Sequence, residues 1–227
     1  LIISLWGGSI RINTPMLFAL AFLPMFGIGG VTGLPLGLNI TDIPLHDTYY
    51  VIGHFHYVVA PGTIFALFAG VYYWYPKATG RAMSETLGKL HFWRSFVFMN
   101  MIFMPMFFTG MAGLSRRLAD GGATYLFSPE ILHYNKVSSD GAWGLALSQI
   151  PFIVNFFWSI FAGRPAPMNP WKATTLEWGA ASPPPLLHWG PTLPTVYRAP
   201  YEYSAPESST AFLPQAQPPA VTAGGRR

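Results

Sequence analysis

Four apolar stretches, each long enough to cross a lipid bilayer, constrain this chain more than any other feature. They cover approximately residues 15–38, 49–74, 90–114 and 141–162. About 20 apolar residues in a helix span the roughly 30 Å hydrocarbon core of a membrane. We therefore predict an all-α polytopic transmembrane helix bundle, with about four membrane helices and a partial helix at the N-terminal end.

The charge content agrees with a membrane protein. Charged residues make up 10% of the 227 residues, against about 25% in soluble domains. The net charge of +4 comes from Lys and Arg between the apolar stretches, where basic residues orient helices in the membrane. No basic run is interleaved with aromatic residues, so nucleic-acid binding is excluded. We expect an integral membrane protein in contact with lipids, in a bacterial cytoplasmic or a mitochondrial inner membrane.

Loop charges predict the orientation of the helices. One side carries Arg11, the connection with Lys77, Arg81 and Lys89, and the basic residues that follow the last apolar stretch. Most of the basic residues are on this side, which predicts that it faces the cytoplasm or the matrix.

The ends of the chain differ in composition from its middle. The chain opens on Leu1 without an initiator Met or a basic leader, which suggests a fragment, a processed product or half of a split protein. From residue 163 proline is dense and the apolar stretches end. We divide the chain into a transmembrane region, 1–162, and a Pro-rich extended tail, 163–227.

Two histidines lie deep in the second apolar stretch, as His54-Phe55-His56. Successive helix residues are about 100° apart around the axis, so His54 and His56 leave the helix on nearly opposite faces. They cannot share one metal in a regular helix, but each can serve a separate cofactor. The chain has no cysteine, which excludes thiolate ligands, and haem iron is then the obvious partner of a membrane imidazole. The alternative is that both imidazoles only hydrogen-bond to polar groups within the bundle.

Two polar pairs lie on the opposite side from most of the basic residues. His46-Asp47 precedes the histidine-bearing stretch and could bind a divalent ion, or Asp47 or Thr48 could simply cap the helix. Arg116-Arg117 could hold carboxylates bidentately, or could be solvated or bound to lipid headgroups. The remaining histidines, near membrane edges or in loops, are interpreted as structural: His91, His133 and His188.

These residues resemble a known family. A signature in the tenth helix of subunit I of haem–copper (aa3-type) cytochrome c oxidase is similar to the string His46-Asp47-Thr48-Tyr49-Tyr50-Val51-Ile52-Gly53-His54-Phe55-His56-Tyr57. Residues 8–33 resemble the eighth-to-ninth helix region, Gly113-Leu114-Ser115-Arg116-Arg117 resembles the arginine pair, and residues 169–198 resemble the tail of bacterial-type members. The resemblance covers nearly the whole chain and identifies it as the C-terminal third of such a subunit.

The resemblance implies roles for individual residues. His54 would be the proximal ligand of the high-spin haem a3, where oxygen is reduced, and His56 an axial ligand of the low-spin haem a. His46 and Asp47 would help to bind magnesium, with Asp42 near that cluster. Arg116 and Arg117 would pair with the haem propionates.

The resemblance also implies what other chains must supply. Copper at the adjacent site, the second axial histidine of the low-spin haem and most of the proton pathway would come from a partner chain with the N-terminal part of subunit I. Subunits II and III and cytochrome c would be further partners. The implied activity is reduction of O2 to water with electrons from cytochrome c, coupled to proton pumping. Electrons would pass from the His56 haem, past Phe55, to the His54 haem.

Two rival functions stay open on the sequence. A quinol oxidase of the same superfamily would differ chiefly in another subunit, and a copper-binding cysteine motif in a partner chain would favour cytochrome c as donor. A cofactor-free membrane scaffold or transporter fragment would contain no haem, and a haem stain of the purified complex would reveal this.

Overall fold

The computed structural model describes residues 2–122, 128–203 and 209–218 and is mostly helical. By internal contacts the chain forms two compact units, one of Leu1–Tyr73 with Ser84–Phe157 and one of Trp74–Met83 with Trp158–Arg227. The division predicted at residue 163 stays a prediction, since the second unit also takes in the end of one helix and a connecting segment.

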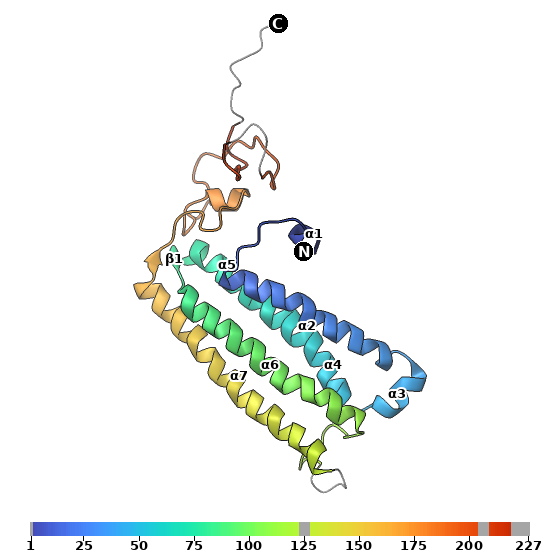
Figure 1. The fold of residues 1–227 in the computed structure, drawn as a ribbon. Helices are drawn as coiled ribbons and strands as arrows, with labels where there is room; N and C mark the ends of the chain where they lie inside the picture. The colour runs from blue at the N-terminus through green and yellow to red at the C-terminus, as the bar shows by residue number, and fades with distance from the viewer. Residues whose placement is uncertain (1, 123–127, 204–208, 219–227) are drawn as a thin grey trace. The chain divides into compact units, whose positions relative to one another are not determined.

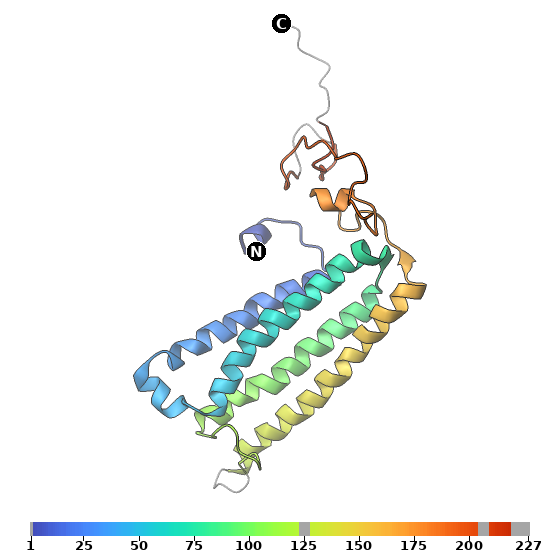
Figure 2. The ribbon, with the colours of Figure 1, turned by 180° about the vertical axis from the view of Figure 1, so that it is seen from behind.

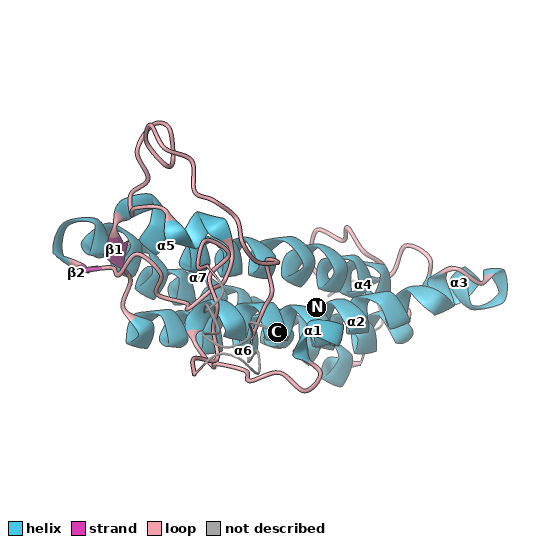
Figure 3. Cartoon of the chain, turned by 90° about the horizontal axis from the view of Figure 1, so that it is seen from above, coloured by secondary structure: helices cyan, strands magenta, loops and turns pink. Residues whose placement is uncertain are grey.

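The helices follow the order of the predicted apolar stretches. In chain order the elements are α1 (Ile2–Leu5), α2 (Thr14–Leu36), α3 (Asn39–Leu45), α4 (Tyr49–Val59), the π-helical η1 (Ala60–Phe65), α5 (Ala66–Thr79), β1 (Arg81–Ala82), α6 (Glu85–Met111), α7 (Pro129–Ala162), β2 (Arg164–Pro165) and the 3₁₀-helical η2 (Leu176–Gly179). Within the first unit α2, α4, α6 and α7 run side by side (Figures 1 and 2). Seen from above, α3 lies where α2 ends and α4 begins (Figure 3).

Three helical spans are long and apolar enough to cross a membrane, namely Thr14–Leu36, Tyr49–Thr79 and Pro129–Ala162. They confirm the predicted class of helical membrane protein. The stretch predicted at 90–114 forms α6, which is not one of these three among the described residues. The number of membrane helices therefore stays a prediction.

Three helices extend into segments that we expected to be loops. The link at 39–47 contains α3, α6 begins at Glu85, and α7 begins at Pro129 rather than near residue 141. Capping explains the early starts, because the Ser84 hydroxyl accepts a hydrogen bond from the Leu87 amide at 3.4 Å. The Ser128 hydroxyl likewise accepts from the Ile131 amide at 3.4 Å, with proline following at the first helical position.

The helix that carries the histidine pair changes its winding at Pro61. The structure shows a π-helical turn, η1, directly after α4 and around this proline. Proline has no N–H to donate to the preceding turn. A wider turn lets a later amide reach the carbonyl that proline leaves unpaired, and α5 then continues the span to Thr79.

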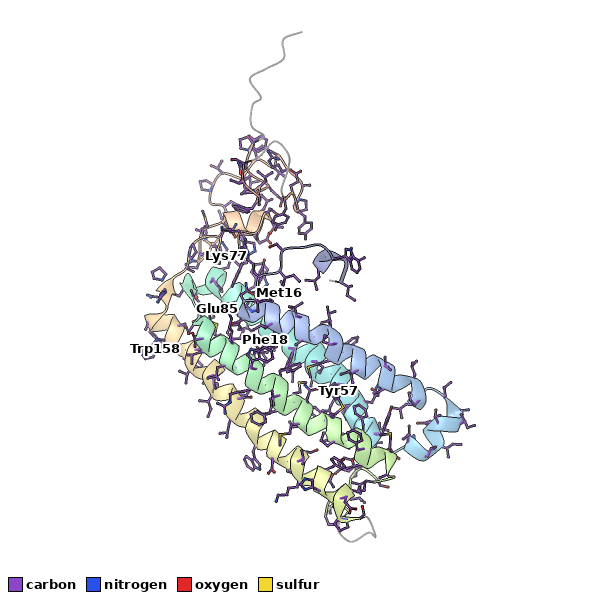
Figure 4. All side chains as sticks on the ribbon, in the orientation of Figure 1. Met16, Phe18, Tyr57, Lys77, Glu85 and Trp158 are labelled. Carbon is purple, nitrogen blue, oxygen red and sulfur yellow. The ribbon has the colours of Figure 1, made fainter. Side chains whose placement is uncertain are left out.

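Close approach of α4 and α6 holds the centre of the bundle together. A Cβ added at Gly110 of α6 would overlap the backbone of Tyr50, and one added at Gly53 of α4 would lie 3.3 Å from the Phe103 carbonyl. Small residues let membrane helices pack this closely. The side chains of Phe18 and Tyr57 point into the bundle (Figure 4), where they are 0% and 1% exposed.

The second unit is built around Trp178. Its indole is fully buried and stacks on Trp74 with ring centroids 5.3 Å apart. Lys77, predicted in a loop, lies in α5 and is buried, and its ammonium donates hydrogen bonds to the carbonyls of Ala180 at 2.6 Å and Met168 at 3.1 Å. The described part of the predicted tail thus has an ordered core, although its regular elements are only β2 and η2.

Candidate functional site

Helix α4 presents the histidine pair, and its start is fixed by Thr48. The Thr48 hydroxyl accepts a hydrogen bond from the Tyr50 amide at 3.2 Å and donates one to the Leu45 carbonyl at 2.7 Å. Thr48 is therefore the N-cap, one of the two capping residues that the sequence suggested.

His54 lies against α2. Its Nδ1 donates a hydrogen bond to the Gly29 carbonyl at 2.9 Å, and the Thr32 hydroxyl lies 3.4 Å from the same nitrogen. A Cβ added at Gly33 would come within 2.8 Å of the imidazole Cε1. The absence of a side chain at Gly33 thus makes room for the ring, and a second helix fixes its position.

His56 lies on the other side of α4, facing α6. Its Nδ1 donates to the Ile52 carbonyl, one turn earlier in the same helix, at 2.9 Å. The Phe103 ring of α6 stacks on the imidazole, with centroids 4.5 Å apart and planes 14° apart. The two imidazoles therefore contact different neighbouring helices, as their spacing predicts.

The chemistry of both rings fits an axial metal ligand. A carbonyl oxygen can only accept, so Nδ1 of each imidazole carries the proton and Nε2 keeps its lone pair. Nε2 of neither ring has a hydrogen-bond partner among the described residues. Metal-binding histidines commonly donate their other ring nitrogen to a backbone carbonyl in this way.

His91 shows what a structural histidine looks like in the same bundle. We expected it near a membrane edge or in a loop, and it lies within the first two turns of α6, where it is fully buried. Its Nδ1 lies 3.1 Å from the Tyr72 hydroxyl and its Nε2 lies 3.2 Å from the Gln149 amide oxygen. With both nitrogens engaged, His91 has none left for a metal, which supports its interpretation as a structural histidine.

The polar pairs meet at the end of the bundle where α4 begins. Arg116 pairs with the Asp47 carboxylate, and its backbone amide donates to the Asp47 carbonyl at 2.9 Å. The Arg116 Nε is buried without a hydrogen-bond partner among the described residues. Asp47 and Arg117 have left-handed backbone conformations, with φ of 58° and 67°, which non-glycine residues adopt rarely outside special turns.

The same end does not form a complete metal site from this chain alone. The two ring nitrogens of His46 lie 3.6 Å and 3.7 Å from the carboxylates of Asp42 and Asp47. Across the described ranges, no group of three or more His, Asp or Glu side chains could hold a metal ion. His46 and Asp47 could supply two ligands, and any others must come from outside the described residues.

Sequence reasoning missed the residues that hold the imidazoles. They are Gly29, Thr32 and Gly33 for His54, and Ile52 and Phe103 for His56. The density of glycine around Gly29 and Gly33 signalled close packing but not its target. The sequence around Phe103 does not show that it contacts His56, because this contact depends on the register between α4 and α6.

A family model and curated relatives match this chain. The model described as cytochrome c and quinol oxidase polypeptide I matches residues 1–144. Cytochrome c oxidase subunit 1 of Synechocystis sp. is 48% identical over 200 residues, which are 88% of this chain and 35% of that protein. The alternative cytochrome c oxidase subunit 1 of Bradyrhizobium diazoefficiens is 42% identical over 219 residues, covering 96% of this chain and 37% of that protein.

A solved structure has a similar fold. A chain of a haem–copper terminal oxidase dimer, determined by cryo-EM, aligns with a TM-score of 0.58 and 25% sequence identity. The alignment covers 66% of this chain and 27% of that chain. The chain spans about a third of the length of the curated relatives described above.

Proposed function

This chain belongs to the cytochrome c and quinol oxidase polypeptide I family, and from that membership we propose that it is the C-terminal part of the catalytic subunit of a terminal respiratory oxidase. The proposed reaction is the reduction of O2 to water with electrons from cytochrome c, coupled to proton pumping. Family membership supports the terminal oxidase role and implies haem and copper as cofactors.

One observation carries the residue assignments. Two imidazoles on opposite sides of α4 each have Nδ1 on a backbone carbonyl and an Nε2 without a partner among the described residues. We assign His54 as the proximal ligand of the high-spin haem a3 and His56 as an axial ligand of the low-spin haem a. When bound, the two haems and a copper held by a partner chain would supply electron transfer and oxygen reduction.

The proposed contribution of this chain is to position the two haem ligands relative to each other. Because both histidines belong to one helix, α4 fixes how far apart their side chains are and how they are oriented. The contacts from α2 to His54 and from α6 to His56 limit ring rotation. Phe55 lies between the two histidines in sequence and is 39% exposed. We propose that its side chain lies between the two haems.

The polar end of the bundle has a proposed role beside the cofactors. We assign Arg116 and Arg117 to the haem propionates, since guanidinium groups bind carboxylates bidentately. The Nε of Arg116, which is buried and has no hydrogen-bond partner among the described residues, supports this assignment. His46 and Asp47 are assigned to magnesium together with ligands from elsewhere, although the Arg116–Asp47 ion pair already engages one of them.

The proposal requires partner chains. We assign the copper site, the second ligand of the low-spin haem and the remaining helices to a chain with the N-terminal part of subunit I, and expect subunits II and III. Mass spectrometry of the intact complex should show a chain, or a continuous extension of this one, that carries those helices. A quinol oxidase remains the second candidate, and turnover of the complex with each donor in turn separates the two.

The assignments are tested by replacing each histidine in the purified complex. His56→Ala should remove the optical band of the low-spin haem, and His54→Ala should abolish oxygen turnover while sparing that band. His133→Ala, at an exposed position on α7, is the matched control and should change neither. Retention of an intact low-spin band in His56→Ala would defeat the assignment, and a complex without haem would support a cofactor-free scaffold.

A further inference from the structure

The stack of Phe103 on His56 joins two membrane helices. The ring planes are nearly parallel, at 14°, and the centroids lie 4.5 Å apart. A second ring near His56 among the described residues is Phe55, its neighbour on α4, at 4.3 Å and 31°. Of the ring contacts found for this imidazole, the stack with Phe103 is the one that reaches across to another helix.

The hydrogen bond of His56 does not by itself fix the plane of its ring. It joins Nδ1 to the Ile52 carbonyl within α4, which sets the tautomer and restrains one atom. The torsion that turns an imidazole about its Cβ–Cγ bond has a broad energy profile. A flat surface against the face of the ring is what selects one orientation.

Phe103 is itself held in place by the α4–α6 contact. Its carbonyl lies where α6 passes Gly53, and one turn earlier Asn100 accepts a hydrogen bond from the Tyr57 hydroxyl at 2.7 Å. The Asn100 amide also donates to the Phe96 carbonyl at 2.8 Å. These contacts on neighbouring turns fix the register of α6 against α4, and so the height of Phe103 beside His56.

We infer that Phe103 is a positioning residue that sets the plane of the His56 imidazole toward the low-spin haem. The inference rests on the proposed function, because it requires His56 to be an axial ligand. The orientation of an axial imidazole tunes the electronic structure of the iron, and contacts outside the ligand set act through that orientation. Phe103 would thereby tune the haem without touching the iron.

The test is electron paramagnetic resonance and redox titration of the complete oxidase complex carrying Phe103→Leu. Loss of the flat face should shift the g values and the midpoint potential of the low-spin haem. Phe103→Tyr keeps the aromatic face and should restore the parent values. The control is Phe108→Leu, also on α6, because Phe108 stacks on Tyr134 of α7 at 5.5 Å and not on a histidine.

The outcomes separate this inference from the proposed function. Parent g values in Phe103→Leu at full haem content, or an equal shift in Phe108→Leu, would overturn the positioning role and leave the His56 assignment standing. Loss of the low-spin haem in Phe103→Leu with recovery in Phe103→Tyr would support the role. A low-spin signal that survives His56→Ala would defeat the proposed assignment of His56, and the positioning role with it.

Discussion

The two histidines of α4 are separated by one residue, yet they are held in different ways. His54 is held by another helix, α2. The Gly29 carbonyl accepts a hydrogen bond from its imidazole, and the ring packs against Gly33, which has no side chain. His56 is fixed by a carbonyl of its own helix and by an aromatic ring from α6. Spacing along one helix therefore decides which neighbour holds each ring, and so which substitutions disturb it.

The largest expected effect comes from filling the space beside His54. In Gly33→Ala the new Cβ would lie 2.8 Å from the imidazole Cε1, so the ring must move. Misplacing a reacting group by about 1 Å can cost about a hundredfold in rate, and oxygen turnover should fall by up to about that factor. The optical band of the low-spin haem should not change.

The matched control lies on the same helix. A Cβ at Gly30 meets nothing within 4 Å, so Gly30→Ala should keep the turnover of the parent. Equal losses in both variants, or a change in the low-spin band of Gly33→Ala, would show that the two histidine sites do not depend on separate neighbours.

A smaller effect is expected at His91, the histidine with both nitrogens engaged. His91→Leu removes the bonds to Tyr72 and Gln149, each worth about 1 kcal/mol. The thermal unfolding midpoint of the complex should fall while both haem spectra stay as in the parent. His133→Leu is the exposed control. A haem band lost in His91→Leu would contradict its structural role.

The smallest effect is expected in the tail, far along the sequence from either histidine. The pKa of Glu202 is held below its usual value by a hydrogen bond from the Ala199 amide and by the Arg198 guanidinium. A depressed pKa stabilises the folded tail above the ordinary carboxyl pKa, and this stabilisation is lost as pH falls through the folded-state value.

Limited proteolysis measures this difference. At neutral pH the tail of the parent should be cut more slowly than that of Glu202→Gln, and the two rates should converge in acid. Because this carboxylate is solvent-exposed, the difference should be small. Haem spectra that changed with Glu202→Gln would show that the tail influences the histidine sites.

The sequence predicted the class of the protein and the essential geometry of α4. Apolar length and low charge indicated membrane helices, and the 3.6-residue period alone required His54 and His56 to face different ways. The predicted starts of α6 and α7 were too late because they coincided with the starts of the apolar stretches. The helices begin earlier, directly after the capping residues Ser84 and Ser128. These signals were present in the sequence.

The supports of the imidazoles could not be predicted in the same way. Phe103 reaches His56 only because Gly53 and Gly110 let α4 and α6 approach in one particular register. Gly33 makes room for the His54 imidazole only because α2 passes α4 with Gly33 opposite that ring. Such contacts depend on how two helices slide against each other, which no local pattern encodes.

The π-helical turn Ala60–Phe65 gives the long span Tyr49–Thr79 a consequence for insertions and deletions. A π turn holds one residue more than the α-helix around it, and one residue corresponds to about 100° of rotation. Deleting one residue from this turn would convert it to ordinary α-helix and keep the segments on either side in phase, whereas deleting one from α4 or α5 would rotate Tyr72 about 100° away from His91. The wide turn therefore accommodates one extra residue between the histidine pair and Tyr72 without changing the faces of the span on which they lie.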